Sequence, residues 1–155
     1  MTDGRESVLL LLCRVGSQLC GLSVEHVSET MRPLPIEPLA RAPEFVLGLS
    51  IIRGSPTPVI DAGRLLESSD RDSSPARFVV LKVGERRAAL ALDAVVGVRE
   101  LPTASLRNLP PLLRDASEDL VQSVGTLDTE LLVVLQSGRL VPDSVWTTIP
   151  TGEAR

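Results

Sequence analysis

The sequence predicts an all-β protein built from two similar halves of about five short strands each. The first observation is an internal repeat, because residues 8–33 are echoed by residues 76–102, and residues 58–66 are echoed by residues 133–141. Such a repeat determines the architecture before any single element does. The second observation is that short aliphatic runs are separated by turn residues at intervals of about 8–12 residues, which is typical of a small barrel or sandwich.

Chain length and net charge limit the classes of protein to which this sequence can belong. The chain has 155 residues, and two cores of roughly 70 residues each would be marginal alone, so we expect the halves to share an interface. A net charge of -4, with 2% aromatic residues and no Tyr, argues against a nucleic-acid surface. The aliphatic runs are far shorter than the about 20 residues of a membrane span, and no signal core is present. We therefore expect a cytoplasmic protein without direct membrane insertion.

The first element of each half is a hairpin. Residues 8–15 and 19–24 form the first, turning at Gly16, and residues 78–83 and 88–92 form its repeat, turning at Gly84. Residues 8–12 are aliphatic at every position, so both faces of that strand are apolar. A strand with two apolar faces lies between two layers, and we expect this one to do so.

A brief helical turn that leads into a strand should follow each hairpin, over residues 24–32 and then over residues 93–101. The proline-rich residues 33–43 exclude a helix or a central strand. Pro43 suits the first position of a short helical turn. Ser117 would cap the matching turn in the second half.

A second hairpin closes each half. Its strands cover residues 47–53 and 57–62 in the first half, and residues 121–127 and 130–136 in the second. The serine- and aspartate-rich stretch SSDRDSSP separates the copies and reads as a linker. The predicted organisation is one domain over residues 7–142, with a first barrel over about 14–67, a linker over 68–75, a second barrel over 76–142 and a short tail over 143–155.

The sequence shows no set of residues typical of catalysis or metal binding. A single histidine, His26, and two cysteines within one hairpin do not make a metal site, and no Ser-centred elbow, phosphate loop or CxxC motif occurs. Cys13 and Cys20 flank the Gly16 turn; a cross-strand disulfide is conceivable, and free thiols in a reducing compartment are the preferred interpretation. We predict no enzyme activity, no cofactor and no metal.

Two further polar or aromatic residues have structural interpretations. Asp61 stands at a strand end just before a glycine, and we expect its side chain to bond to local backbone. Trp146, the sole tryptophan, either covers a barrel end or anchors a partner.

Residues 42–66, APEFVLGLSIIRGSPTPVIDAGRLL, resemble the CheW family, the coupling proteins of bacterial chemosensory arrays. The shared pattern is Ala-Pro, an apolar pair, Gly, a strand ending in Arg-Gly, then Pro-Val-Ile-Asp and Arg-Leu-Leu. Residues 15–29 are similar to the family's Gly turn, hairpin strand and Val-x-Glu segment. The resemblance implies two pseudo-symmetric, five-stranded SH3-like barrels packed together, with the strand over residues 8–13 able to cross into the second barrel.

The resemblance also implies a function. Such proteins are adaptors that bind the cytoplasmic tip of a chemoreceptor and the regulatory domain of a CheA-type histidine kinase, and other CheW-like proteins. Carried over by position, Val27, Glu29 and Arg53 match receptor-binding positions, and Gly48 matches a kinase-binding position.

Two alternatives remain open from the sequence. Ile51 and Ile52 stand before Arg53 where the family usually has Asn and Leu, so an accessory CheW-like protein that binds receptor without binding kinase is the second interpretation. An unrelated small-ligand-binding β-barrel is the third, and it would show a deep polar pocket with converging titratable groups.

Comparing the copies separates packing residues from candidate binding residues. Val27 matches Val95, so core packing accounts for part of its role, whereas Glu29 falls on Gly97. Gly48 matches Ser123, which indicates that a small residue is needed there, and Arg53 falls on Asp128. The two positions that break the repeat in charge, Glu29 and Arg53, are therefore the strongest candidates for a binding site.

Overall fold

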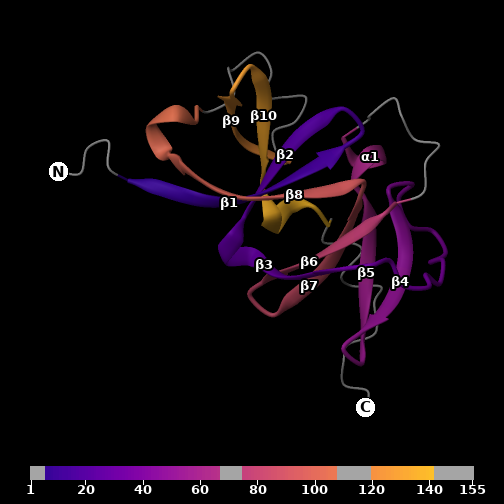
Figure 1. Ribbon diagram of the computed structural model, residues 1–155. Helices are drawn as coiled ribbons and strands as arrows, with labels where there is room; N and C mark the ends of the chain where they lie inside the picture. The colour runs from indigo at the N-terminus through magenta and orange to yellow at the C-terminus, as the bar shows by residue number, and fades with distance from the viewer. Residues whose placement is uncertain (1–5, 67–74, 108–119, 142–155) are drawn as a thin grey trace.

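The computed structural model describes residues 6–66, 75–107 and 120–141, which form two packed five-stranded sheets (Figure 1). The first sheet has the order β8-β1-β2-β10-β9, and the second has the order β3-β6-β7-β5-β4. The strands of the first sheet are β8 (Ala94–Pro102), β1 (Ser7–Val15), β2 (Gln18–Ser23), β10 (Glu130–Leu135) and β9 (Val121–Leu127). The strands of the second sheet are β3 (Val27–Met31), β6 (Arg77–Val83), β7 (Arg86–Leu92), β5 (Ser55–Asp61) and β4 (Val46–Ile52).

The internal repeat is visible in the order of the strands. Exchanging the two copies turns one sheet order into the other, since β1 to β5 correspond in sequence to β6 to β10. Each sheet also contains one parallel pair at the same place, β2 with β10 and β5 with β7. The prediction of two similar five-stranded units is confirmed.

The sheets exchange their hairpins, which differs from the predicted assignment of residues 14–67 to the first barrel and 76–142 to the second. The hairpin β1-β2 lies between β8 and β10, and the hairpin β6-β7 lies between β3 and β5. We expected only the strand over residues 8–13 to cross; β2 crosses with it because it pairs with β1 from Leu10↔Ser23 to Val15↔Gln18. Backbone hydrogen bonds join the two strands of a hairpin, so β1 and β2 both lie in the sheet whose other strands come from the second half of the sequence.

The two hairpins form the middle of a layered core, as the apolar faces of residues 8–12 predicted. Leu10 and Leu12 of β1 belong to a cluster inside the first sheet, whereas Leu11 and Cys13 belong to the cluster between the two sheets. The side chains of β6 alternate in the same way. Phe78 and Val80 belong to a cluster inside the second sheet, whereas Val79 and Leu81 belong to the cluster between the two sheets. These four residues are at most 3% exposed. Burying apolar surface on both faces of a strand stabilises the packed pair of sheets.

Within the described residues, four short helical elements connect the strands: η2 (Val24–His26), α1 (Ala62–Leu65), η3 (Thr103–Ser105) and η4 (Ser137–Arg139). The predicted helical turn before β3 is η2, but β8 begins at Ala94 without one. There the backbone N–H of Asp93 donates to the Arg14 carbonyl at 3.1 Å, which holds the chain extended at the start of β8. Pro43 begins a single turn, closed by the Val46 N–H at 2.9 Å, rather than a helix.

Three predictions fall outside the described residues: the linker over 68–75 in all but its last position, the turn capped by Ser117, and Trp146 in the tail. Within the described residues no helix is long and apolar enough to cross a membrane.

Candidate functional site

The structure brings Glu29 and Arg53 together. Glu29 lies on the outer strand β3, and Arg53 lies in the turn between β4 and β5. The Arg53 guanidinium donates from Nε to Oε2 of Glu29 at 3.0 Å and from Nη2 to Oε1 at 2.7 Å. Two such bonds form the bidentate geometry that makes arginine–carboxylate pairs both strong and directional.

The pair is half open to solvent. The Arg53 side chain is 68% exposed and the Glu29 side chain only 22% exposed, so the carboxylate faces the protein and the guanidinium faces outward. The hydrogen bonds from Arg53 hold the pKa of Glu29 below its ordinary value, and the charges of Arg53 and Arg87 lower it further. Solvent screens an exposed pair, so its contribution to folding stability is small. What the pair provides is a fixed orientation for a solvent-facing cation.

The backbone at Arg53 has an unusual conformation. Its φ of 54° is in the left-handed region, and Gly54 follows with a φ of 79°. Asp128, the counterpart of Arg53, has a φ of 59° in the matching turn. Two consecutive positive φ angles characterise the tight hairpin turn that favours Asn, Asp and Gly. The backbone conformation alone would favour a residue such as Asp128. The presence of an arginine at position 53 is therefore explained by the contacts of its side chain and not by the turn.

The ion pair also joins the two outer strands of one sheet. β3 and β4 are the first and last strands of the order β3-β6-β7-β5-β4, and the pair links β3 to the turn at the end of β4. Ile51, two residues before Arg53, is an apolar side chain that is 64% exposed. The site therefore combines an arginine held in the turn after β4 with an exposed aliphatic residue on β4 itself.

Val27 lies near the pair in sequence but not on the same face of β3. Val27 is opposite Leu81 and Glu29 is opposite Val80, so Ser28 is an extra residue, a β-bulge. Because Leu81 and Val80 point to opposite faces of β6, the bulge turns Val27 and Glu29 to opposite faces as well. Val27 packs against the cluster between the sheets, which is the core role that its match to Val95 indicated.

Gly48 is fixed by close backbone contact. It is buried on β4 with a φ of 145°, and a Cβ atom at this position would lie 2.0 Å from the backbone oxygen of Glu37. Glu37 and Leu49 exchange backbone hydrogen bonds of 2.7 and 2.8 Å across this contact. The requirement for a small residue is thus first a packing requirement, as its match to Ser123 suggested.

In the second copy, a cavity lies at the position that corresponds to the Arg53–Glu29 pair. Gly97 and Asp128 stand where the first copy has Glu29 and Arg53, and they border a cavity of about 260 Å³. A different ion pair lies at its rim: Arg14 donates to Glu130, with Nη2 2.8 Å from Oε1 and Nη1 close to Oε2. Sequence reasoning did not find this pair, because 116 residues separate its members and no local pattern links them.

The remaining polar candidates have structural roles. The Asp61 side chain caps α1, its Oδ1 accepting from the Gly63 and Arg64 N–H groups at 2.9 and 3.3 Å, as expected. Cys13 and Cys20 are directly opposite across the β1-β2 hairpin, buried and free. Burial raises the pKa of each thiol to about 12. Within the described ranges, no three His, Cys, Asp or Glu side chains gather where they could hold a metal ion.

Two five-stranded sheets with exchanged hairpins thus present a surface arginine that is held by a carboxylate. The family model described as CheW-like domain matches residues 9–145. The chain is 35% identical to protein FrzA of Myxococcus xanthus over 107 residues, covering 68% of this chain and 66% of FrzA. It is 24% identical to the chemotaxis protein CheW of Rhizobium meliloti over 140 residues, covering 90% of this chain and 88% of that protein.

A solved structure has the same fold. The scaffolding protein TtCheW from Thermoanaerobacter tengcongensis superposes with a TM-score of 0.76 at 23% identity, covering 84% of this chain and 90% of that one. The chain belongs to the CheW-like domain family. It is a scaffold or adaptor of chemosensory signalling and not an enzyme.

Proposed function

We propose that this protein couples the cytoplasmic tip of a chemoreceptor to the regulatory domain of a CheA-type histidine kinase, with Arg53 as the main receptor contact. The observation that carries the proposal is the Arg53–Glu29 pair, which orients an exposed guanidinium at a place where the second copy has Asp128 and Gly97. Membership of a family of chemosensory adaptors supports the class of partner.

Arg53 retains N–H donors that a partner can use. A guanidinium carries five N–H donors, and Glu29 uses one on Nε and one on Nη2. The others lie on a side chain that is 68% exposed, so they can bind a carboxylate or the terminal carbonyls of a receptor helix. Glu29 lowers the cost of binding because it already restricts the rotamers of a long side chain.

Val27 and Gly48 have supporting roles in this proposal. Val27 fixes β3 against the core between the sheets, so it positions Glu29 from the opposite side of the bulge. Gly48 keeps β4 close to Glu37, and we propose that the kinase reads the shape of this outer strand. Other CheW-like proteins are further candidate partners.

The test is the binding of a purified receptor-tip fragment, measured by isothermal titration calorimetry. Arg53→Asn removes the guanidinium and keeps a residue that tolerates the left-handed turn. We expect at least a tenfold loss of affinity with an unchanged melting temperature. Asp128→Asn, at the matching turn of the second copy, is the control and should bind normally. Equal affinity for Arg53→Asn and the unchanged protein would overturn the assignment.

A second function is favoured by one observation. Ile51, 64% exposed on β4, occupies a position where the family usually has a polar Asn, and it changes the outer strand that the kinase would read. The alternative is an accessory adaptor that binds receptor without kinase. Stoichiometric capture of the kinase regulatory domain by the purified protein would eliminate this alternative, whereas receptor binding without kinase capture would establish it.

A further inference from the structure

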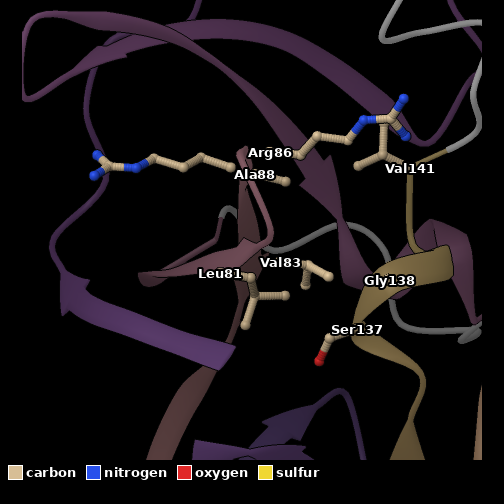
Figure 2. A pocket seen from close by; sticks show the side chains of 8 residues that line it. Leu81, Val83, Arg86, Ala88, Ser137, Gly138 and Val141 are labelled. Atoms are coloured by element: carbon tan, nitrogen blue, oxygen red, sulfur yellow. The ribbon is translucent and has the colours of Figure 1, made fainter. Parts of the chain in front are cut away.

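A cavity of about 260 Å³ lies where the tip of the β6-β7 hairpin meets η4 (Figure 2). Its apolar wall is formed by Leu81, Val83 and Ala88 from the hairpin and by Val141 from the chain after η4. Pockets that enclose a small-molecule ligand are usually larger, at about 300–1,000 Å³. The size of the cavity therefore suits one large side chain better than a cofactor or a metabolite.

Val83 is the least covered residue of this apolar wall. It is half-buried, whereas Leu81 and Val141 are buried. A Cβ atom added to Gly138 of η4 would lie 3.7 Å from Cγ1 of Val83, so the valine side chain faces η4 across the cavity (Figure 2). Val15, at the same place in the β1-β2 hairpin, is only 1% exposed. The second hairpin tip thus leaves apolar surface uncovered where the first does not.

The residues that follow each copy of the repeat differ as well. Leu66 ends the first copy and Val141 ends the second. The first copy continues with ESSDRDSSP, which has no Val, Ile, Leu, Met or aromatic residue. The second continues with PDSVWTTIP, which contains the sole tryptophan of the chain, Trp146. An apolar segment therefore follows the copy whose hairpin tip is incompletely covered.

The length of chain between the cavity and Trp146 is short enough for the two to meet. Val141 lies in the cavity wall, and residues 142–145 separate it from Trp146. The sequence Val-Pro-Asp-Ser over residues 141–144 favours a β-turn, because proline suits the second position of types I and II. A β-turn brings its first and fourth residues within about 7 Å of each other, so it would return the chain toward the cavity wall.

We propose that Trp146 docks in this cavity and fills the space between the β6-β7 hairpin and η4. The indole ring covers Val83, and burial of its large apolar surface stabilises the closed arrangement. Because η4 follows β10 of the first sheet and the hairpin belongs to the second, the docked ring links the two sheets. The inference is independent of the proposed receptor contact, since neither Arg53 nor Glu29 takes part.

Intrinsic fluorescence of the full chain tests the docking, because the signal comes from Trp146 alone. We expect the native protein to emit at a shorter wavelength than the urea-unfolded protein and to be quenched less by acrylamide. A native emission maximum and a quenching constant equal to those of the unfolded protein would overturn the proposal.

Two matched variants localise the ring. Val83→Ser removes the uncovered part of the wall, and we expect the acrylamide quenching constant to rise by about twofold or more as the indole loses its apolar contacts. Val98→Ser makes the same change at a residue that is 58% exposed on β8 and lines the other cavity, and it should leave the quenching unchanged. A thermal melt of each variant verifies folding. Equal quenching in Val83→Ser and the unchanged protein, or an increase in Val98→Ser alone, would contradict the assignment.

Nuclear Overhauser effects give an independent readout. The indole protons of Trp146 should show contacts to the methyl groups of Val83, and the ring-current shift of these methyl groups should disappear in Trp146→Ala. The contacts should be the same at low and high protein concentration. Contacts that form only at high concentration would assign the cavity to a second copy of the chain, and contacts of the ring with other strands would place it elsewhere; either result would overturn the proposal.

Discussion

Arg53 and Glu29 are 24 residues apart in sequence and meet through two hydrogen bonds that join opposite outer strands of one sheet. The second copy has the corresponding strands, the same bulge and a left-handed residue at the same place in the turn, but Asp128 and Gly97 cannot form this contact. The second copy therefore serves as an internal comparison for the ion pair of the first. Two structurally equivalent places differ by one ion pair, and the one that has it presents an oriented arginine to solvent.

The ion pair should be visible in the titration of Glu29. Its pKa is lowered in the folded protein, so the pair stabilises the fold above the ordinary pKa of a glutamate, and this contribution is lost as pH falls through the lowered value. In Arg53→Asn the pKa of Glu29 should rise back toward the ordinary value of a glutamate, because its main hydrogen-bond donor is gone. Carboxyl chemical shifts measured by NMR during an acid titration report both values. A Glu29 pKa that is the same in both proteins would mean that the pair does not form in solution.

Replacing Gly48 should destabilise the fold through steric contact. In Gly48→Ala the new Cβ atom would meet the Glu37 oxygen at 2.0 Å, and we expect a loss of about 3 kcal/mol or more. Gly97→Ala is a matched control, because Gly97 has a similar φ of 152° with nothing within 4 Å of the added atom. The control should lose only about 1 kcal/mol from backbone strain. Urea unfolding of both variants measures the difference, and equal losses would refute the steric account.

The cap at Asp61 gives a third prediction. Asp61→Ala removes an acceptor for two N–H groups at the start of α1 and should cost about 1 kcal/mol of unfolding free energy. Gln136 is at the equivalent position before η4 and makes no side-chain cap bond, so Gln136→Ala should change stability by less than about 0.5 kcal/mol. Thermal denaturation of the two variants checks the contrast.

The cysteine pair should be chemically silent in the folded protein. Cys13 and Cys20 are 0% and 1% exposed, and burial raises the pKa of each to about 12. Thiolate is the reactive form, so neither should react with Ellman's reagent at pH 8 until the protein is unfolded. The raised pKa values also imply that stability falls as pH rises above the ordinary thiol pKa of about 8.5. Rapid labelling of the native protein would contradict the burial.

Local patterns in the sequence predicted a large part of the fold. The repeat predicted two equivalent five-stranded units, and the unbroken aliphatic run at residues 8–12 predicted a strand between two layers. Charge differences between the copies selected Glu29 and Arg53, which the structure joins. The inferences about the fold succeeded because each depends on residues close in sequence or on a direct comparison of the copies, and the binding role of Glu29 and Arg53 stays a prediction.

The remaining features depend on distant contacts that leave no local pattern. The parallel pairing of β2 with β10 places Cys20 beside Val133, and nothing near either residue indicates the other. The bulge at Ser28 separates the faces of Val27 and Glu29, although a regular strand would place residues two apart on the same face. The cavity at the β6-β7 tip forms because η4, which is distant in sequence, lies against it.

The exchange of hairpins has a consequence for how the molecule folds. Neither half of the sequence contains all the strands of either sheet, so neither can complete a sheet by itself. Fragments made by cutting the chain between the copies should each remain unfolded and should regain structure only when mixed. Stability is therefore expected to be lost in one cooperative transition. Folding is expected to be slow, because the N-terminal strands β1 and β2 must first pair with β8 and β10, which are distant in sequence.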